Sequence, residues 1–158
     1  MRLFAIPVLV LVAVVGLGAT FAPDGQQFAR GSATLTSAKK VVTIRAELAR
    51  TPAERAQGLM HRRSLPANAG MAFLYPEGSR GAFWMKNTLI PLSAAFYDGR
   101  GRILRILQMQ PCRTEACPIY DPGVFYRGVL EVNAGAFGRW GIRVGDRIMV
   151  RAAASPSG

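Results

Sequence analysis

The sequence predicts a mostly β domain, a compact antiparallel β sandwich or barrel with one or two short helices. Short runs rich in β-branched and aromatic residues recur along the chain, turn-forming residues separate them, and the runs do not follow a parallel βαβ rhythm. At 158 residues the chain is long enough for one such domain and too short for two of full size.

The first 22 residues have the character of an export segment. Met1-Arg2 is a basic start, and the stretch Leu3–Ala22 is almost continuously apolar with small residues at its end. At about 1.5 Å per residue this stretch also spans the roughly 30 Å of a bilayer core, so a cleaved signal peptide and an uncleaved anchor both stay open. Either interpretation predicts an exported protein of the periplasm or cell envelope.

The rest of the chain is predicted to be one domain with polar ends. Residues 23–39 are polar with little periodicity, and we expect them to tether the export segment to a single β domain at 40–152. We expect a disordered tail over residues 153–158.

The domain is predicted to begin with a strand and a capped helix. Lys39–Arg50 contains the run Val-Val-Thr-Ile, which favours a strand. Thr51-Pro52-Ala53-Glu54 has the pattern of a capping box with proline at the first helical position, so a short helix should run to about Met60.

The later elements are inferred from apolar runs between turn sequences such as Pro76–Ser79 and Asp98–Gly101. A short helix is predicted from about Ala134 to Trp140, closed by Gly141. We expect strands, joined as antiparallel hairpins, over Met71–Tyr75, Ala82–Thr88, Leu92–Tyr97, Arg102–Met109, Val129–Val132 and Arg147–Val150.

The chain is strongly basic, with 20 Lys and Arg against 9 Asp and Glu and a net charge of +11. Positive charge that is spread along an exported protein favours anionic lipid or acidic envelope polymers as neighbours and disfavours nucleic acid, although a compositional bias toward arginine also explains it. One histidine, two cysteines and no dense acidic cluster argue against a metal site, and no cofactor is expected.

Cys112 and Cys117 lie in a loop between Pro111 and Pro118. Two cysteines in an oxidising compartment most often pair, so we predict a disulfide that shapes the loop. The alternative is a redox-active pair, but thioredoxin-like chemistry uses two intervening residues in a βαβ setting, whereas four residues intervene here.

Four segments together resemble a known family. They are Gly58-Leu59-Met60-His61-Arg62, Gly70-Met71-Ala72-Phe73, Phe83 to Leu92 and Leu130 to Gly135. In this order they resemble the bacterial and archaeal family called domain of unknown function 192, over about Val41 to Arg151. The resemblance implies a jelly-roll-like β domain, often behind an export signal, and no established activity. Ser93 departs from the family pattern, which usually places an aspartate after Ile-Pro-Leu.

The segment Phe83–Thr88 is the candidate edge of a ligand cleft. Trp84 offers a stacking face, Lys86 a point charge and Thr88 a hydroxyl, a combination suited to an anionic or carbonyl-bearing ligand. The alternative places Trp84 in the core, with Lys86 reaching along it to water and with Asn87 and Thr88 bonded to a turn.

Arg62, Tyr120 and Glu131 are further candidates for the same cleft. Arg62 follows the predicted helix and either caps its end, pairs with Glu131 or faces a ligand. Glu131 has apolar neighbours along the chain, so its carboxylate lies either on the solvent face or inside and paired. A catalytic role for Glu131 would need a partner acid, base or nucleophile that the sequence does not place.

These observations favour an exported binding or accessory module of the cell envelope over an enzyme, because no complete catalytic set is evident. Its partner would be an unidentified envelope ligand or protein. Two alternatives stay open. One is an enzyme acting on envelope carbohydrate or acyl groups, with Glu131 as acid or base and Lys86 stabilising negative charge. The other is a structural assembly partner.

Overall fold

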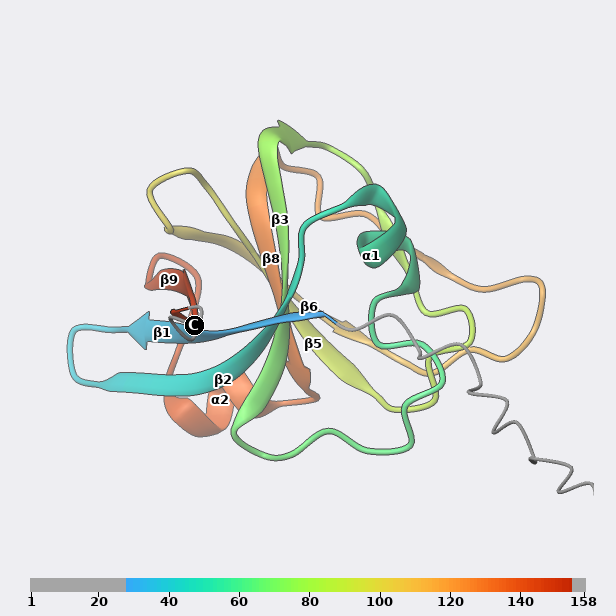
Figure 1. The fold of residues 1–158 in the computed structure, drawn as a ribbon, viewed down its shortest axis with the longest axis horizontal. Helices are drawn as coiled ribbons and strands as arrows, with labels where there is room; N and C mark the ends of the chain where they lie inside the picture. Colours follow the sequence, from blue (N-terminus) through green and yellow to red (C-terminus); the bar gives the residue numbers. More distant parts are fainter. Residues whose placement is uncertain (1–27, 155–158) are drawn as a thin grey trace, which may run out of the picture.

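A computed structural model describes residues 28–154 and confirms the mostly β class (Figure 1). The short helices are α1 (Pro52–Gln57) and α2 (Ala136–Trp140), and a small ladder pairs β4 (Phe83–Trp84) with β7 (Ile119–Tyr120). The main sheet has seven strands in the order β6-β5-β8-β3-β2-β1-β9. Their bounds in chain order are β1 Ala29–Thr36, β2 Val41–Ala49, β3 Ala69–Ser79, β5 Leu92–Tyr97, β6 Ile103–Met109, β8 Tyr126–Asn133 and β9 Arg147–Ala152.

Neighbouring strands of the sheet are antiparallel except for β2 and β3, which run parallel from the pair Arg45 and Ala69 to the pair Ala49 and Phe73. Helix α1 lies on the connection between them, so this part of the chain is a βαβ unit. The expectation of antiparallel hairpins throughout is therefore wrong here. The physical reason is that α1 and the loop after it provide the length that a crossover between parallel strands needs.

The sheet curls until its edge strand β9 reaches the start of β6. Arg102 and Arg147 form an isolated antiparallel bridge, and the Ile148 N–H donates to the Gly101 carbonyl at 2.7 Å. A Cβ on Gly101 would lie 2.2 Å from the Ile148 oxygen, so only glycine allows this approach. Two further backbone hydrogen bonds continue this contact, from the Ile103 N–H to the Asp146 carbonyl at 2.8 Å and from the Gly145 N–H to the Ile103 carbonyl at 2.9 Å. Among the described residues no ladder joins β6 to β9 beyond Ile103, so the sheet is a curled sandwich rather than a closed barrel.

Strand β1 corrects the expectation of a polar tether over 23–39 where the strand lies, and with it the expectation of a domain that begins at residue 40. Residues 23–27 of the expected tether lie outside the described residues. β1 pairs with β2 on one side and with β9 on the other. Ala33 and Leu35 are wholly buried, whereas the Thr34 hydroxyl lies 3.1 Å from that of Thr43 on the outer face. The polar residues of this segment lie on the outside of a strand, so the domain begins near Ala29.

The predicted export segment, residues 1–22, lies outside the described residues, as does the end of the predicted tail. Among the residues that the structure describes, no helix has both the length and the apolar character needed to cross a membrane.

The capping box at α1 is confirmed. The Thr51 hydroxyl accepts from the Glu54 N–H at 3.2 Å, and the Glu54 carboxylate accepts from the Thr51 N–H at 2.7 Å. The helix ends at Gln57 rather than near Met60, because Gly58 adopts a φ of +48°. This glycine brings the chain close to Phe73, whose ring would lie 3.1 Å from an added Cβ.

Two other local expectations differ from the structure. The predicted turn at Pro76–Ser79 is an irregular part of β3, where the register with β8 shifts between Leu74 and Ser79. The predicted strand Ala82–Thr88 is extended only at β4, because Asn87 has a φ of +57° and reverses the chain.

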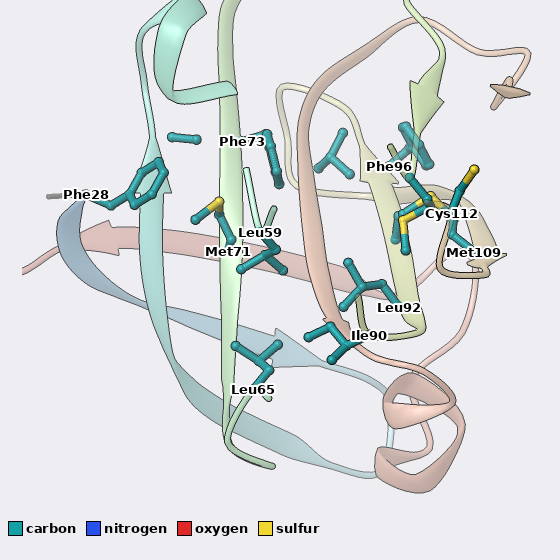
Figure 2. Packing of buried hydrophobic residues seen from close by; sticks show 14 of the residues in the cluster. Phe28, Leu59, Leu65, Met71, Phe73, Ile90, Leu92, Phe96, Met109 and Cys112 are labelled. Carbon is teal, nitrogen blue, oxygen red and sulfur yellow. The ribbon is translucent and has the colours of Figure 1, made fainter. Parts of the chain in front are cut away.

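The two faces of the sheet bury separate cores. The inner face, with Leu35, Ile44 and Leu130, is closed by Phe137 of α2. The other face is covered by α1 and the connections around it, and Figure 2 shows Leu59 beside β3 and Cys112 near Met109 in this second core. Glu131 belongs to β8, between β3 and β5, and faces the second core, so the covering segments decide what surrounds it.

Candidate functional site

A pocket of about 130 Å³ opens where α1, β3, β8 and the segment 82–88 meet. Residues 55–60 form one wall, and Phe73 and Tyr75 of β3 form another. Phe83, Trp84, Met85 and Thr88 line the third side, and Glu131 reaches the pocket from β8. The pocket therefore joins residues from four parts of the chain that are distant in sequence.

Glu131 is a buried carboxyl without a protein partner. Opposite it across the sheet stand Met71 of β3 and Ala94 of β5, and the residue is 5% exposed. No hydrogen bond or ion pair joins its carboxyl to another of the described residues. Burial raises the pKa of Glu131 from its ordinary value of 4.5 to about 8, so the carboxyl is mostly protonated at neutral pH.

Thr88 is a second buried polar residue in the same pocket. It is 5% exposed, and its N–H donates to the Met85 carbonyl at 3.0 Å in the turn that Asn87 makes. Its hydroxyl forms no hydrogen bond with any other described side chain. The Asn87 carbonyl accepts from the His61 N–H at 2.8 Å, so Asn87 shapes the turn and does not line the pocket.

Trp84 lies at the edge of the pocket and is 50% exposed, so the interpretation that placed it in the core is wrong. The neighbouring Phe83 points inward, with its ring centre 5.5 Å from that of Phe73 and 5.3 Å from that of Phe96 in edge-to-face contacts. Strand alternation explains the difference, because successive side chains of β4 point to opposite sides.

Lys86, Arg62 and Tyr120 lie outside the pocket. Lys86 forms an ion pair with Glu115 and lies 5.8 Å from the centre of the Trp84 ring. Arg62 pairs with Glu47 through two contacts of 2.7 and 2.5 Å, beside a separate hollow along β2. Of the seven candidates, the structure brings Trp84, Thr88 and Glu131 together and separates the rest.

Tyr120 has a structural role in the disulfide loop. Its hydroxyl accepts from the Gln110 N–H at 3.0 Å, and across the small ladder it pairs with Phe83. The disulfide between Cys112 and Cys117 is confirmed, with the two Cα atoms 5.8 Å apart. The Cys112 backbone forms bridges with both Lys86 and Thr88, so this loop holds the wall of the pocket in place.

Arg55 and Tyr75 line the pocket, although no motif in the sequence indicated a role for them. The Arg55 guanidinium lies 4.7 Å above the Tyr75 ring and donates to the carbonyls of Arg50 and Leu74. Burial, followed by the nearby Tyr126, raises the pKa of Tyr75, and Glu131 contributes in the same direction. Tyr75 lies two residues after Phe73, a spacing that places both on one face of β3.

The comparisons with known proteins agree with this fold. The DUF192 family, described as an uncharacterized ACR, matches residues 33–150. A crystal structure from Sinorhizobium meliloti 1021, provisionally described as a transcription regulator, has 35% identity and a TM-score of 0.74, covering 80% of this chain and 97% of that one. A protein of unknown function from Novosphingobium aromaticivorans has 35% identity and a TM-score of 0.70, covering 75% of this chain and 83% of that one. No curated protein matches the chain.

Proposed function

The chain belongs to the DUF192 family, and we propose that it is a binding or accessory module of the cell envelope whose ligand enters the pocket between Trp84 and Glu131. One observation carries the proposal. The Glu131 carboxyl is buried without a protein partner and opens into an aromatic pocket. The carboxyl borders the pocket rather than being sealed from it, so hydrogen-bonding groups of a ligand could pair with it there.

The size of the pocket limits the part of a ligand that it holds. An engineered apolar cavity of about 150 Å³ accommodates one benzene molecule. A pocket of about 130 Å³ therefore encloses a group of about that size, and a larger ring would be held in part, with the rest outside the mouth. The half-exposed Trp84 at its edge would contact whatever part of the ligand extends outward.

Ligand screening by thermal shift and NMR tests this proposal. The panel holds fragments of envelope glycans, lipid headgroups and small anions. Duplex DNA is the negative control, because nucleic acid is not an expected partner. A ligand should raise the melting temperature of the full chain, and Trp84→Ala should weaken that effect about tenfold or more. Phe125→Ala is the matched control, since Phe125 is 44% exposed and does not line the pocket. Equal effects of both substitutions, or no ligand in the panel, would reject the pocket as a binding site.

The envelope location is a separate part of the proposal, supported by the basic start and the apolar run of Leu3–Ala22. A reporter active only outside the cytoplasm should be fused after the C-terminus of the full chain, because β1 begins at Ala29 and an earlier junction would divide the sheet. Activity is expected, and the intact mass of the exported product distinguishes cleavage near Ala22 from a retained anchor. Activity of a cytoplasmic reporter alone would overturn the location.

The enzyme alternative required Lys86 and Glu131 to face each other, and the two side chains do not. Lys86 pairs with Glu115 instead of facing Glu131, and Glu131 is the single carboxyl among the described residues that line the pocket. A protonated Glu131 could still act as a general acid, but two-carboxylate hydrolysis needs a second group that this pocket does not supply. Binding is therefore the function that the geometry supports better.

A further inference from the structure

We propose that the pocket recognises an uncharged, hydroxylated ring, such as one sugar unit, through the buried Glu131 carboxyl and the Thr88 hydroxyl. This inference rests on the binding function proposed above and specifies its ligand class.

The hydrogen-bonding capacity of the two groups supports this class. Glu131 and Thr88 are each 5% exposed, line the same pocket and have no side-chain partner among the described residues. A protonated carboxyl and a hydroxyl can each donate one hydrogen bond and accept others. Hydroxyl groups of a ligand have the same dual capacity, so a polyol can satisfy both residues without adding a charge.

A cationic ligand is disfavoured by Arg55, which lines the pocket, and by Lys86, which occupies a face of Trp84 from outside it. The Arg55 guanidinium lies over Tyr75 at 4.7 Å and has only carbonyl partners, so its charge has no ion-pair partner among the described residues. The Lys86 ammonium lies 5.8 Å from the Trp84 ring centre. Arg55 and Lys86 thus occupy the aromatic faces that a ligand ammonium would need for cation–π contact. A further cation at either face would be repelled.

An anionic ligand is disfavoured at the inner end of the pocket. The neighbours there are Phe73, Phe83 and Met85, and burial is the cause of the raised pKa of Glu131, with no cation lowering it. An anion placed beside Glu131 would therefore be buried without a counter-charge, which is too costly for stable binding. The cation of α1 that lines the pocket, Arg55, is held over the Tyr75 ring by bonds to the Arg50 and Leu74 carbonyls. The Tyr75 hydroxyl of β3 is neutral, and Lys86 is paired with Glu115.

Trp84 supplies the remaining recognition element. Its ring lines the pocket and is half exposed, so a ring held by Glu131 and Thr88 can stack against it through C–H groups. The pocket thus combines an apolar stacking face at the mouth with uncharged hydrogen-bonding groups at the base.

An NMR titration of the full chain with three matched rings tests the ligand class. Glucose, glucuronate and glucosamine each consist of one ring. At about pH 6 glucose is neutral, glucuronate is negatively charged and glucosamine is positively charged. We expect glucose to shift the amide signals of Thr88 and Glu131 at concentrations about tenfold lower than the other two rings require. Its affinity should also decrease about tenfold per pH unit above about pH 8, where Glu131 ionises.

Three variants connect the result to the residues. Glu131→Gln keeps a donor and an acceptor but does not titrate, so glucose binding should persist and lose its dependence on pH. Thr88→Val should weaken glucose binding about tenfold, and the matched Thr88→Ser should retain it. The ¹⁵N spectrum of each variant checks that the chain is folded.

The outcomes separate this inference from the proposed function. Tighter binding of glucosamine with proton release, or of glucuronate with proton uptake, would overturn the ligand class and leave the pocket as a binding site. Failure of all three rings would also overturn the ligand class. The binding function itself fails only if, in addition, no member of the screening panel binds in a manner that depends on Trp84.

Discussion

The Ser93 hydroxyl accepts a hydrogen bond from the Gly135 N–H at 2.8 Å and so ties strand β5 to the start of α2. The same hydroxyl donates to the Gln108 side-chain oxygen of β6 at 2.7 Å, and Ser93 is wholly buried. Because its neighbour Ala94 faces Glu131, Ser93 points to the opposite side of the sheet. The hydroxyl oxygen at this position therefore supports α2 and does not reach the pocket.

Replacing Ser93 with alanine should destabilise the domain without affecting the pocket. The substitution leaves the Gly135 N–H and the Gln108 side chain without their buried partner, which should lower the free energy of unfolding by about 1 to 3 kcal/mol. Urea denaturation measures this change, with Ser64→Ala in an exposed loop as the control. Loss of ligand binding in a folded Ser93→Ala protein would contradict the separation of the two faces.

Glu131 should make the domain less stable as the pH rises. Its pKa is about 8 in the folded protein and near 4.5 in the unfolded chain, so its contribution is complete below about pH 4.5 and is lost as the pH rises through about 8. Between these values the free energy of unfolding should decrease by at most about 1.4 kcal/mol per pH unit. Glu131→Gln should remove this slope.

Denaturation of the wild type and Glu131→Gln at several pH values from about 5 to 9 tests that prediction. Taking the difference between the two proteins cancels the contribution of every other titrating group that the substitution leaves unchanged. Parallel pH profiles would mean that Glu131 is ionised in the folded protein, and the account of its environment would then be wrong.

Opening the disulfide should loosen one wall of the pocket while the main sheet stays folded. The loop between Cys112 and Cys117 is short, so Cys112→Ser with Cys117→Ser should cost about 1 to 3 kcal/mol. Hydrogen exchange should become faster in β4, β7 and at Thr88, because the Cys112 backbone bridges this segment. β8 should keep its protection.

Thiol labelling of the natively expressed protein provides the complementary measurement for the disulfide. We expect no labelling before reduction and two labelled cysteines after it. Two reactive thiols in the untreated protein would contradict the bond. Turnover of a dithiol substrate that disappears in the double variant would instead support the redox alternative.

Two tyrosines with different hydroxyl environments should respond oppositely to removal of the oxygen. The Tyr97 hydroxyl is buried without a hydrogen-bond partner, whereas the Tyr126 hydroxyl donates to the Gly81 carbonyl at 2.8 Å. Tyr97→Phe should leave the melting temperature unchanged or raise it, since it removes an unsatisfied group. Tyr126→Phe should cost about 1 kcal/mol. A larger loss for Tyr97→Phe would show that its hydroxyl has a partner in solution.

Local features of the chain could be predicted from the sequence because their determinants lie a few residues apart. The capping box needs only Thr51 and Glu54, and the disulfide needs Cys112 and Cys117 in one loop. The short helix before Gly141 follows from its neighbours in the same way. The mostly β class follows from the alternating apolar runs, which record how each segment buries one face.

The surroundings of the candidate residues could not be predicted, because they depend on contacts between distant segments. Lys86 lies beside Glu115 and Arg62 beside Glu47, and no spacing in the sequence relates these pairs. β1 was missed for the same reason, since its polar residues acquire the face of a strand only when β2 and β9 pair with it.

The chain alone predicts that Glu131 stands among apolar neighbours, and it leaves open whether the carboxyl faces solvent or lies inside with a partner. In the folded domain the carboxyl lies inside and has no partner among the described residues. Its strand lies between β3 and β5, and α1 and the segment 82–88 cover that face, so burial and the adjoining pocket depend on four segments that meet only in the folded protein.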